Sequence, residues 1–78
     1  MKTEAPPSLE TVEGILDEVD EYYDRVSCIR QKMRRHKRGS DPYVELLAEL
    51  SVEVDVLKNK AQWAEEIIER FEDSLPDE

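Results

Sequence analysis

The chain has 78 residues and a net charge of −9, and 40% of its residues are charged while only 6% are aromatic. This length fits one small domain, and no apolar run approaches the roughly 20 residues that a membrane-spanning helix needs. A single cysteine, Cys28, excludes an internal disulfide and a zinc site built from thiolates.

The N-terminal part predicts a short lead followed by a long helix. We expect residues 1–7 to be a flexible lead, because Pro6 and Pro7 disfavour helix before them. The lead lacks the apolar run of a signal peptide, so we expect a soluble, cytoplasmic protein. Ser8 suits the N-cap of a first helix over residues 9–37, in which Gly14 is a mild weakness. Residues spaced alternately three and four apart form a heptad line on this helix, which consists of Leu9, Val12, Leu16, Val19, Tyr23, Val26, Arg30 and Met33.

Residues 38–41 predict a turn between two helices. Gly39 suits the left-handed position after a helix end, and Asp41 with Pro42 is typical of an N-cap followed by the first helical residue. A second helix is expected over residues 42–74, and Pro76 begins a polar tail over residues 76–78. Because the connection is short, the helices are expected to be antiparallel neighbours.

The second helix carries an uncharged heptad line of its own. It consists of Tyr43, Leu47, Leu50, Val54, Leu57, Ala61, Ala64, Ile68, Phe71 and Leu75. If the chain folds back at Ser40, every residue of the first line meets one of the second, for example Leu16 with Ala64. The hairpin, residues 8–75, is therefore predicted to be an all-α, antiparallel, coiled-coil-like pair of helices. Arg30 would face Leu50, so we expect it to extend outward or to pair with an acid such as Glu53.

Further apolar residues lie beside these two lines and predict an interaction surface. They are Ile15, Tyr22, Ile29, Leu46, Val56, Trp63 and Ile67, which we expect to bind a partner. The opposite flank is expected to be wet. A two-helix unit of this size has a marginal core, so we expect the flank to complete a bundle in a homodimer or with a different protein.

The charges are unevenly distributed between the two ends of the predicted hairpin. A basic tip is formed by Arg30, Lys32, Arg34, Arg35, Lys37 and Arg38. Three explanations of this basic tip are open. It serves helix-dipole capping and solubility, or it docks on an acidic surface or on the acidic base of another copy. The third is that it binds nucleic acid. Nucleic acid is disfavoured because the rest of the rod would repel it. As an alternative function, the acidic rod would mimic nucleic acid and inhibit an enzyme that acts on it, although Arg25, Lys58 and Lys60 interrupt its acidic rows.

No catalytic residue, metal site or cofactor is predicted. His36 lies in a basic run with no carboxylate or thiol nearby in sequence, so we expect an exposed histidine. Cys28 is expected to be a small, semi-buried residue. The acids Glu65, Glu66 and Glu69 are expected to form a solvated helix face.

The residues around the turn also resemble a known family. The run from Arg38 to Pro42, followed by Leu46 and Leu47 and later by Ala64 and Ile67–Ile68, is similar to the small co-chaperones of type III secretion needle proteins. The needle subunits themselves have a proline before the turn serine, where this chain has Gly39. The resemblance, over residues 29–71, implies binding of a helical-repeat chaperone and shielding of an aggregation-prone subunit. Together these features predict a non-enzymatic adaptor or co-chaperone that binds proteins through an apolar flank.

Overall fold

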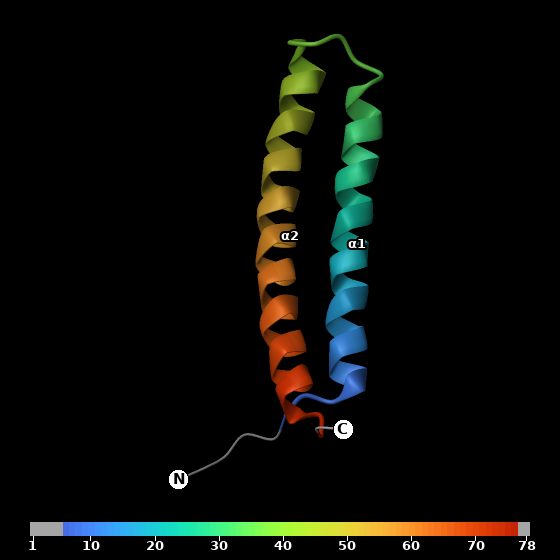
Figure 1. The fold of residues 1–78 in the computed structure, drawn as a ribbon. Coiled ribbons are helices and arrows are strands. Elements are labelled where there is room, and N and C mark those ends of the chain that lie inside the picture. Colours follow the sequence, from blue (N-terminus) through green and yellow to red (C-terminus); the bar gives the residue numbers. More distant parts are fainter. Residues whose placement is uncertain (1–5, 77–78) are drawn as a thin grey trace.

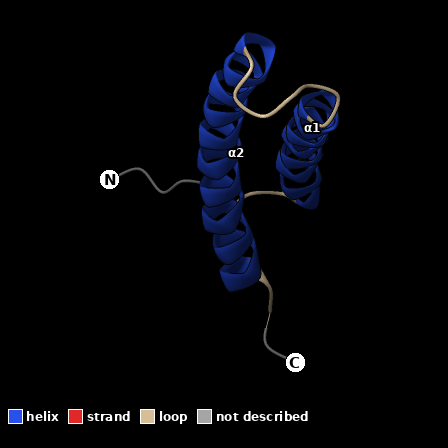
Figure 2. Ribbon diagram, turned by 90° about the horizontal axis from the view of Figure 1, so that it is seen from above, coloured by secondary structure: helices blue, strands red, loops and turns tan. Residues whose placement is uncertain are grey.

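A computed structural model describes residues 6–76 of the chain as two long helices and a short connection (Figure 1). Helix α1 spans Leu9–Met33 and α2 spans Asp41–Ser74. The helices lie side by side and antiparallel (Figures 1 and 2), in a rod with extents of 56 × 27 × 16 Å. The predicted all-α hairpin is confirmed. Residues 1–5 and 77–78, which belong to the expected lead and tail, lie outside the described residues.

Both helices begin at a serine cap. The Ser8 hydroxyl accepts a hydrogen bond from the Thr11 backbone N–H at 3.2 Å, as predicted for an N-cap. At the start of α2 the cap is Ser40, whose hydroxyl accepts from the Tyr43 N–H at 3.4 Å. The prediction that Asp41 is the cap is therefore wrong by one residue. Ser40 has the extended backbone that a cap needs, and Asp41 is already in the first turn, where its charge suits the helix dipole.

The connection begins earlier than the sequence predicts, because α1 ends at Met33 rather than near Lys37. Beyond Met33 the basic side chains Arg34 and Arg38 would stack one turn apart in a helix, where like charges repel. The N–H of Ser40 bonds to the carbonyl of Lys37 at 3.0 Å and closes a four-residue turn. Gly39 has a φ of +84° in this turn, so its predicted left-handed backbone is confirmed, although it lies in the turn and not at the end of α1.

The contact between the helices uses a heptad line on each of them. On α1 the buried and half-buried line is Val12, Ile15, Val19, Tyr22, Val26, Ile29 and Met33. On α2 it is Tyr43, Leu46, Leu50, Glu53, Leu57, Lys60, Ala64, Ile67 and Phe71. The densest packing joins the start of α1 to the end of α2, where Val12 and Ile15 form one cluster with Ala64 and Ile67. This places the ends of the helices together as the predicted fold-back requires.

Half of each predicted heptad line is wrong. Leu16 and Tyr23 on α1, and Val54 and Ile68 on α2, were expected between the helices but are exposed. Their places are taken by residues one position earlier in each helix, such as Ile67 in place of Ile68. The uncharged line on α2 is more apolar than the line that is buried, which contains Glu53 and Lys60. These two side chains are accommodated because residues of α1 supply opposite charges beside them.

Candidate interaction surface

An apolar stripe lies exposed along one side of the hairpin. Its members recur at seven-residue intervals on each helix, which keeps them on one face. Tyr23 is 60% exposed and Val54 is 45% exposed, so the stripe is open to solvent in the single chain. We define the exposed apolar stripe as Leu9, Leu16, Tyr23, Leu47, Val54, Ala61 and Ile68.

Toward the base of the rod, where α1 begins and α2 ends, the stripe is hollowed into a groove of about 310 Å³. Leu16 and Val19 of α1 form one wall, and Ile68 of α2 forms the other. The small side chains Ala61 and Ala64 leave the hollow between these walls. The carboxylates of Glu65 and Glu69 stand at its rim, so the groove is apolar inside and acidic at its edge.

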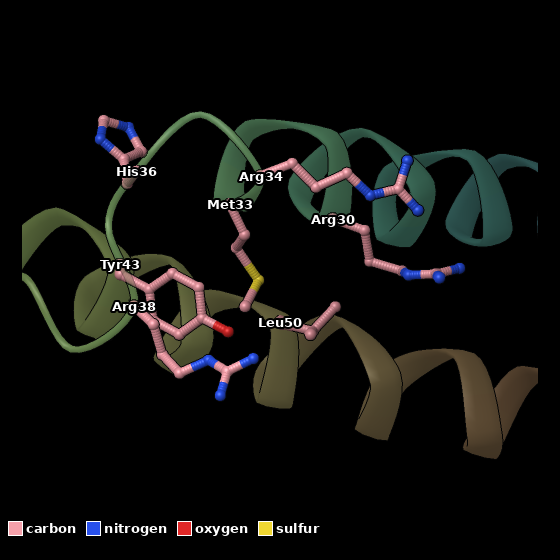
Figure 3. Close-up of a pocket in the computed structure, with 7 residues that line it drawn as sticks. All are labelled: Arg30, Met33, Arg34, His36, Arg38, Tyr43 and Leu50. Carbon is pink, nitrogen blue, oxygen red and sulfur yellow. The ribbon is translucent and has the colours of Figure 1, made fainter.

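At the tip of the rod, the same side of the hairpin carries a basic cavity of about 430 Å³ (Figure 3). Its floor consists of Met33, Tyr43 and Leu50. Figure 3 shows the basic side chains around this floor, which come from α1, from its C-cap and from the connection. They are Arg30, Arg34, His36 and Arg38.

The predicted basic tip is thus divided between two sides of the rod. All six of its residues are exposed. Lys32 and Arg35 line a separate cavity that also contains Glu45 and Glu49, so their charges face acids of the same chain. The cations beside the stripe, by contrast, share their cavity with no acidic side chain. The stripe-side arginines are therefore available to an acidic surface.

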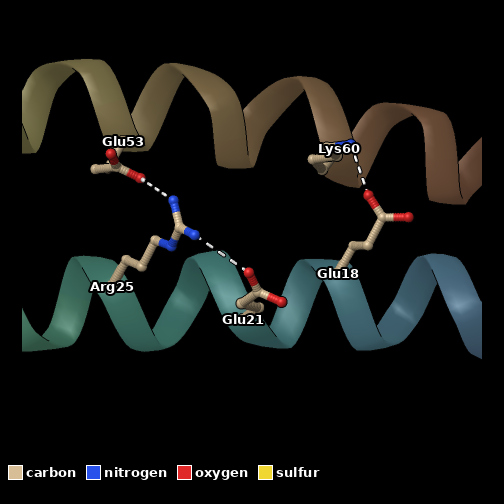
Figure 4. A network of polar contacts seen from close by, with 5 residues as sticks. All are labelled: Glu18, Glu21, Arg25, Glu53 and Lys60. Atoms are coloured by element: carbon tan, nitrogen blue, oxygen red, sulfur yellow. Dashed lines mark hydrogen bonds and ion pairs between the residues drawn. The ribbon is translucent and has the colours of Figure 1, made fainter.

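The flank opposite the stripe is charged, and two of its ion pairs join the two helices (Figure 4). Lys60 Nζ donates a hydrogen bond to Glu18 Oε1 at 2.6 Å, and this carboxylate raises the pKa of Lys60 above its ordinary value. Arg25 lies between two acids, 3.2 Å from Glu21 Oε1 and 3.8 Å from Glu53 Oε1. The Glu53 oxygen is buried and accepts no hydrogen bond within the described chain, so this ion pair is its main compensation.

Two aromatic rings lie on this charged flank. The Arg25 guanidinium is 4.6 Å from the centre of the Tyr22 ring, and Lys60 Nζ is 5.5 Å from the centre of the Trp63 ring. Both are cation–π distances. Tyr22 and Trp63, which the sequence predicted to contact a partner, therefore contact cations of their own chain.

The predicted partner-binding residues are distributed differently from the expectation. Ile15, Ile29 and Ile67 are buried between the helices and do not face outward, contrary to the prediction that they bind a partner. Tyr22, Leu46 and Val56 are half-buried, and only Trp63 is exposed, at 49%. The exposed apolar side of the hairpin is therefore the one that the sequence predicted to be polar, and the side predicted to be apolar is charged. Of the two alternatives expected for Arg30, outward extension is confirmed because Arg30 is exposed, whereas Glu53 pairs with Arg25.

The remaining polar candidates are single residues on the surface. His36 is exposed in the connection, among arginines. Cys28 is an exposed free thiol, whereas the sequence suggested a semi-buried one.

Within residues 6–76, no three His, Cys, Asp or Glu side chains come together in a way that could hold a metal ion. Over the same residues, neither helix has the length and apolar character needed to cross a membrane.

The fold and its two unlike flanks define an antiparallel helical hairpin with one apolar side open to solvent. No protein-family model matches the chain, and neither a curated protein nor a solved structure matches it. The surfaces of the hairpin are therefore the basis on which its function is assigned.

Proposed function

We propose that the chain is a non-enzymatic helical-hairpin module that binds protein partners through the exposed apolar stripe. The observation that carries this proposal is the alignment of exposed Leu, Val, Ile and Tyr side chains from both helices on one side of the rod. A helix with a single neighbour needs only a narrow apolar face, whereas wider faces are typical of bundles with more helices. Large exposed apolar patches on small proteins mark interaction sites.

The small core of the hairpin supports the same proposal. Among the described residues only six hydrophobic side chains are buried, four of them on α1. Two-helix units of this size gain little net stability from their own core, and natural examples add a partner or an oligomer. A partner that binds only the folded hairpin would stabilise it by mass action. Binding through the stripe would therefore supply stability as well as recognition.

A partner helix is the shape that fits the stripe best. The groove beside Ala61 and Ala64 runs between the two helices, and amphipathic helices dock into such grooves with residues spaced three or four apart. The resemblance to type III secretion co-chaperones gives this proposal a specific form, in which the hairpin binds a helical chaperone and shields an aggregation-prone subunit. The cytoplasm is the compartment in which such a module would act.

Site-specific photo-crosslinking in cells of the native host tests the proposal. Val54 and Val52 are matched positions, because both are exposed valines of α2, yet they point about 160° apart around the helix axis. A photoreactive residue in place of Val54 is expected to form protein adducts, and one in place of Val52 is not. Adducts at Val52 alone, equal adducts at both positions, or none at Val54 would contradict the proposal.

Salt provides a second test of how the module binds. Contacts through an apolar stripe are expected to survive high salt, whereas binding led by the acidic surface, as in a nucleic-acid mimic, should weaken steeply. Val54 adducts that persist when the cells are lysed and crosslinked at high salt would support binding through the stripe. Their loss under these conditions would favour the charge-led alternative.

A further inference from the structure

The two edges of the exposed apolar stripe change charge from one end of the rod to the other. On α1 the residues next to the stripe are acidic toward the base, at Glu13 and Asp20, and basic at the tip, at Arg34. On α2 the edge passes from Lys58 to Glu65 and then to Glu72 at the base. Arg30 and Arg34 border the basic cavity at one end, while Glu65 and Glu69 border the apolar groove at the other. The stripe therefore has opposite charges at its two ends.

The stripe also has a projecting side chain and an apolar groove that could receive such a side chain from another copy. Tyr23 is the most exposed large side chain of the stripe, at 60%, and its ring presents a large apolar surface. The groove beside Ala61 and Ala64 is the hollow, and it begins about two turns nearer the base than Tyr23. The midpoint between the projection and the hollow falls close to the middle of the stripe. A two-fold axis at this point would place each Tyr23 in the groove of the other copy.

We propose that the occupant of the stripe is a second copy of this chain, packed antiparallel so that two hairpins form a four-helix bundle. This inference rests on the proposed function of the stripe as an interface, and it names the partner. In this arrangement the basic tip of each copy, with Arg30 and Arg34, lies over the acidic base of the other, which carries Glu13, Glu65 and Glu69. A parallel arrangement would instead bring the arginines of both tips together, at a cost from like charges. Two-fold symmetry makes one self-complementary surface sufficient for both partners.

The size of the stripe fits a stable dimer. Along α2, from Leu47 to Ile68, it is about 32 Å long at 1.5 Å per residue. Two helices, each about 10 Å across, give a face of roughly 640 Å² in plan. A rough surface has more area than its plan, so each copy approaches the roughly 800 Å² that a standard interface buries per partner.

Sedimentation of the purified chain with charge-reversed variants tests the proposal, with reducing agent present because Cys28 is exposed. The tip variant carries Arg30→Glu and Arg34→Glu, the base variant carries Glu65→Lys and Glu69→Lys, and the combined variant carries all four. The wild type is expected to be a dimer, and the tip and base variants should each dissociate roughly tenfold or more readily at low salt. The combined variant should recover wild-type affinity, because its charges are again opposite. Circular dichroism of each variant checks that the helices are retained.

The outcomes separate this inference from the proposed function. A wild type that stays monomeric through the micromolar range overturns the antiparallel dimer, while Val54 adducts to a different protein would leave the proposed function intact. A dimer that neither charge variant weakens points to a parallel arrangement or another face, and overturns the inference as well. A combined variant that dimerises as weakly as the tip variant also overturns the inference. Loss of dimerisation in Tyr23→Ala but not in Val52→Ala supports the prediction that Tyr23 binds in the groove of the other copy.

Discussion

Lys60 of α2 and Glu18 of α1 are 42 residues apart in sequence, and their side chains meet at 2.6 Å. Lys60 occupies a heptad position that an apolar residue would fill in a simple pair of helices. Its partner comes from the position beside the buried line of α1, so the contact exists only when the two helices are aligned as they are here. Together with Arg25 and Glu53, this pair links the register of the hairpin to electrostatics as well as to packing.

The pKa of Lys60 gives a direct test of this contact. The Glu18 carboxylate raises this pKa above the ordinary 10.5, so the ion pair stabilises the fold fully below about pH 10.5. The stabilisation is then lost as the pH rises through the folded-state pKa. In Glu18→Gln we expect a lower Lys60 pKa, measured by NMR titration, and a melting temperature whose deficit from wild type shrinks above about pH 10.5. An unchanged Lys60 pKa in the variant would show that the contact does not form.

Glu53 is expected to cost stability. Its Oε1 atom is buried without a hydrogen bond, and the nearest cation, Arg25, is 3.8 Å away. Removing a buried charge for an apolar side chain is favourable when no other charge is left buried alone, and Arg25 is half-exposed and keeps its ion pair with Glu21. We expect Glu53→Leu to raise the free energy of unfolding by about 1 kcal/mol in urea titrations. The same change at exposed Glu21 should alter it by less than about 0.5 kcal/mol, and a destabilised Glu53→Leu variant would contradict this view.

The two glycines predict opposite effects of one substitution. A methyl group added at either position meets no atom within 4 Å, so only the backbone decides. Gly39 has a φ of +84°, and Gly39→Ala is expected to destabilise the hairpin by about 1 kcal/mol. Gly14 lies inside α1, and Gly14→Ala is expected to stabilise it by roughly 0.5–1 kcal/mol. Thermal unfolding followed by circular dichroism measures both, and changes of the same sign would refute the assignment of the turn.

Trp63 provides a fluorescence probe that should be insensitive to assembly. It lies on the charged flank beside Lys60, away from the exposed apolar stripe. We expect the Trp63 emission maximum and its quenching by acrylamide to stay constant as the protein is concentrated, even while it associates. Trp63→Ala should likewise leave the association constant unchanged. A blue shift on concentration would place Trp63 in the interface, as the sequence alone suggested.

The helices, their antiparallel arrangement, the Ser8 cap and the positive φ of Gly39 could all be predicted from local chemistry. The choice of buried face could not be predicted from hydropathy, because the line through Val54 and Ile68 is uncharged while the buried line contains Glu53 and Lys60. The preference depends on contacts between helices, since Arg25 and Glu18 of α1 compensate these charges. One signal was present in the sequence, because the predicted line on α1 contained Arg30 and the buried one contains no charge.

The face of α2 that packs on α1 is the claim on which the exposed apolar stripe depends, and Ile67 and Ile68 test it most directly. They are adjacent residues of the same type, 7% and 39% exposed. At a concentration low enough that further dilution does not shift the unfolding midpoint, Ile67→Ala should lower the free energy of unfolding by about 3 kcal/mol. Ile68→Ala should lower it by less than about 1 kcal/mol. The reverse order in urea titrations would mean that Ile68 is buried between the helices and that the stripe has been assigned to the wrong side.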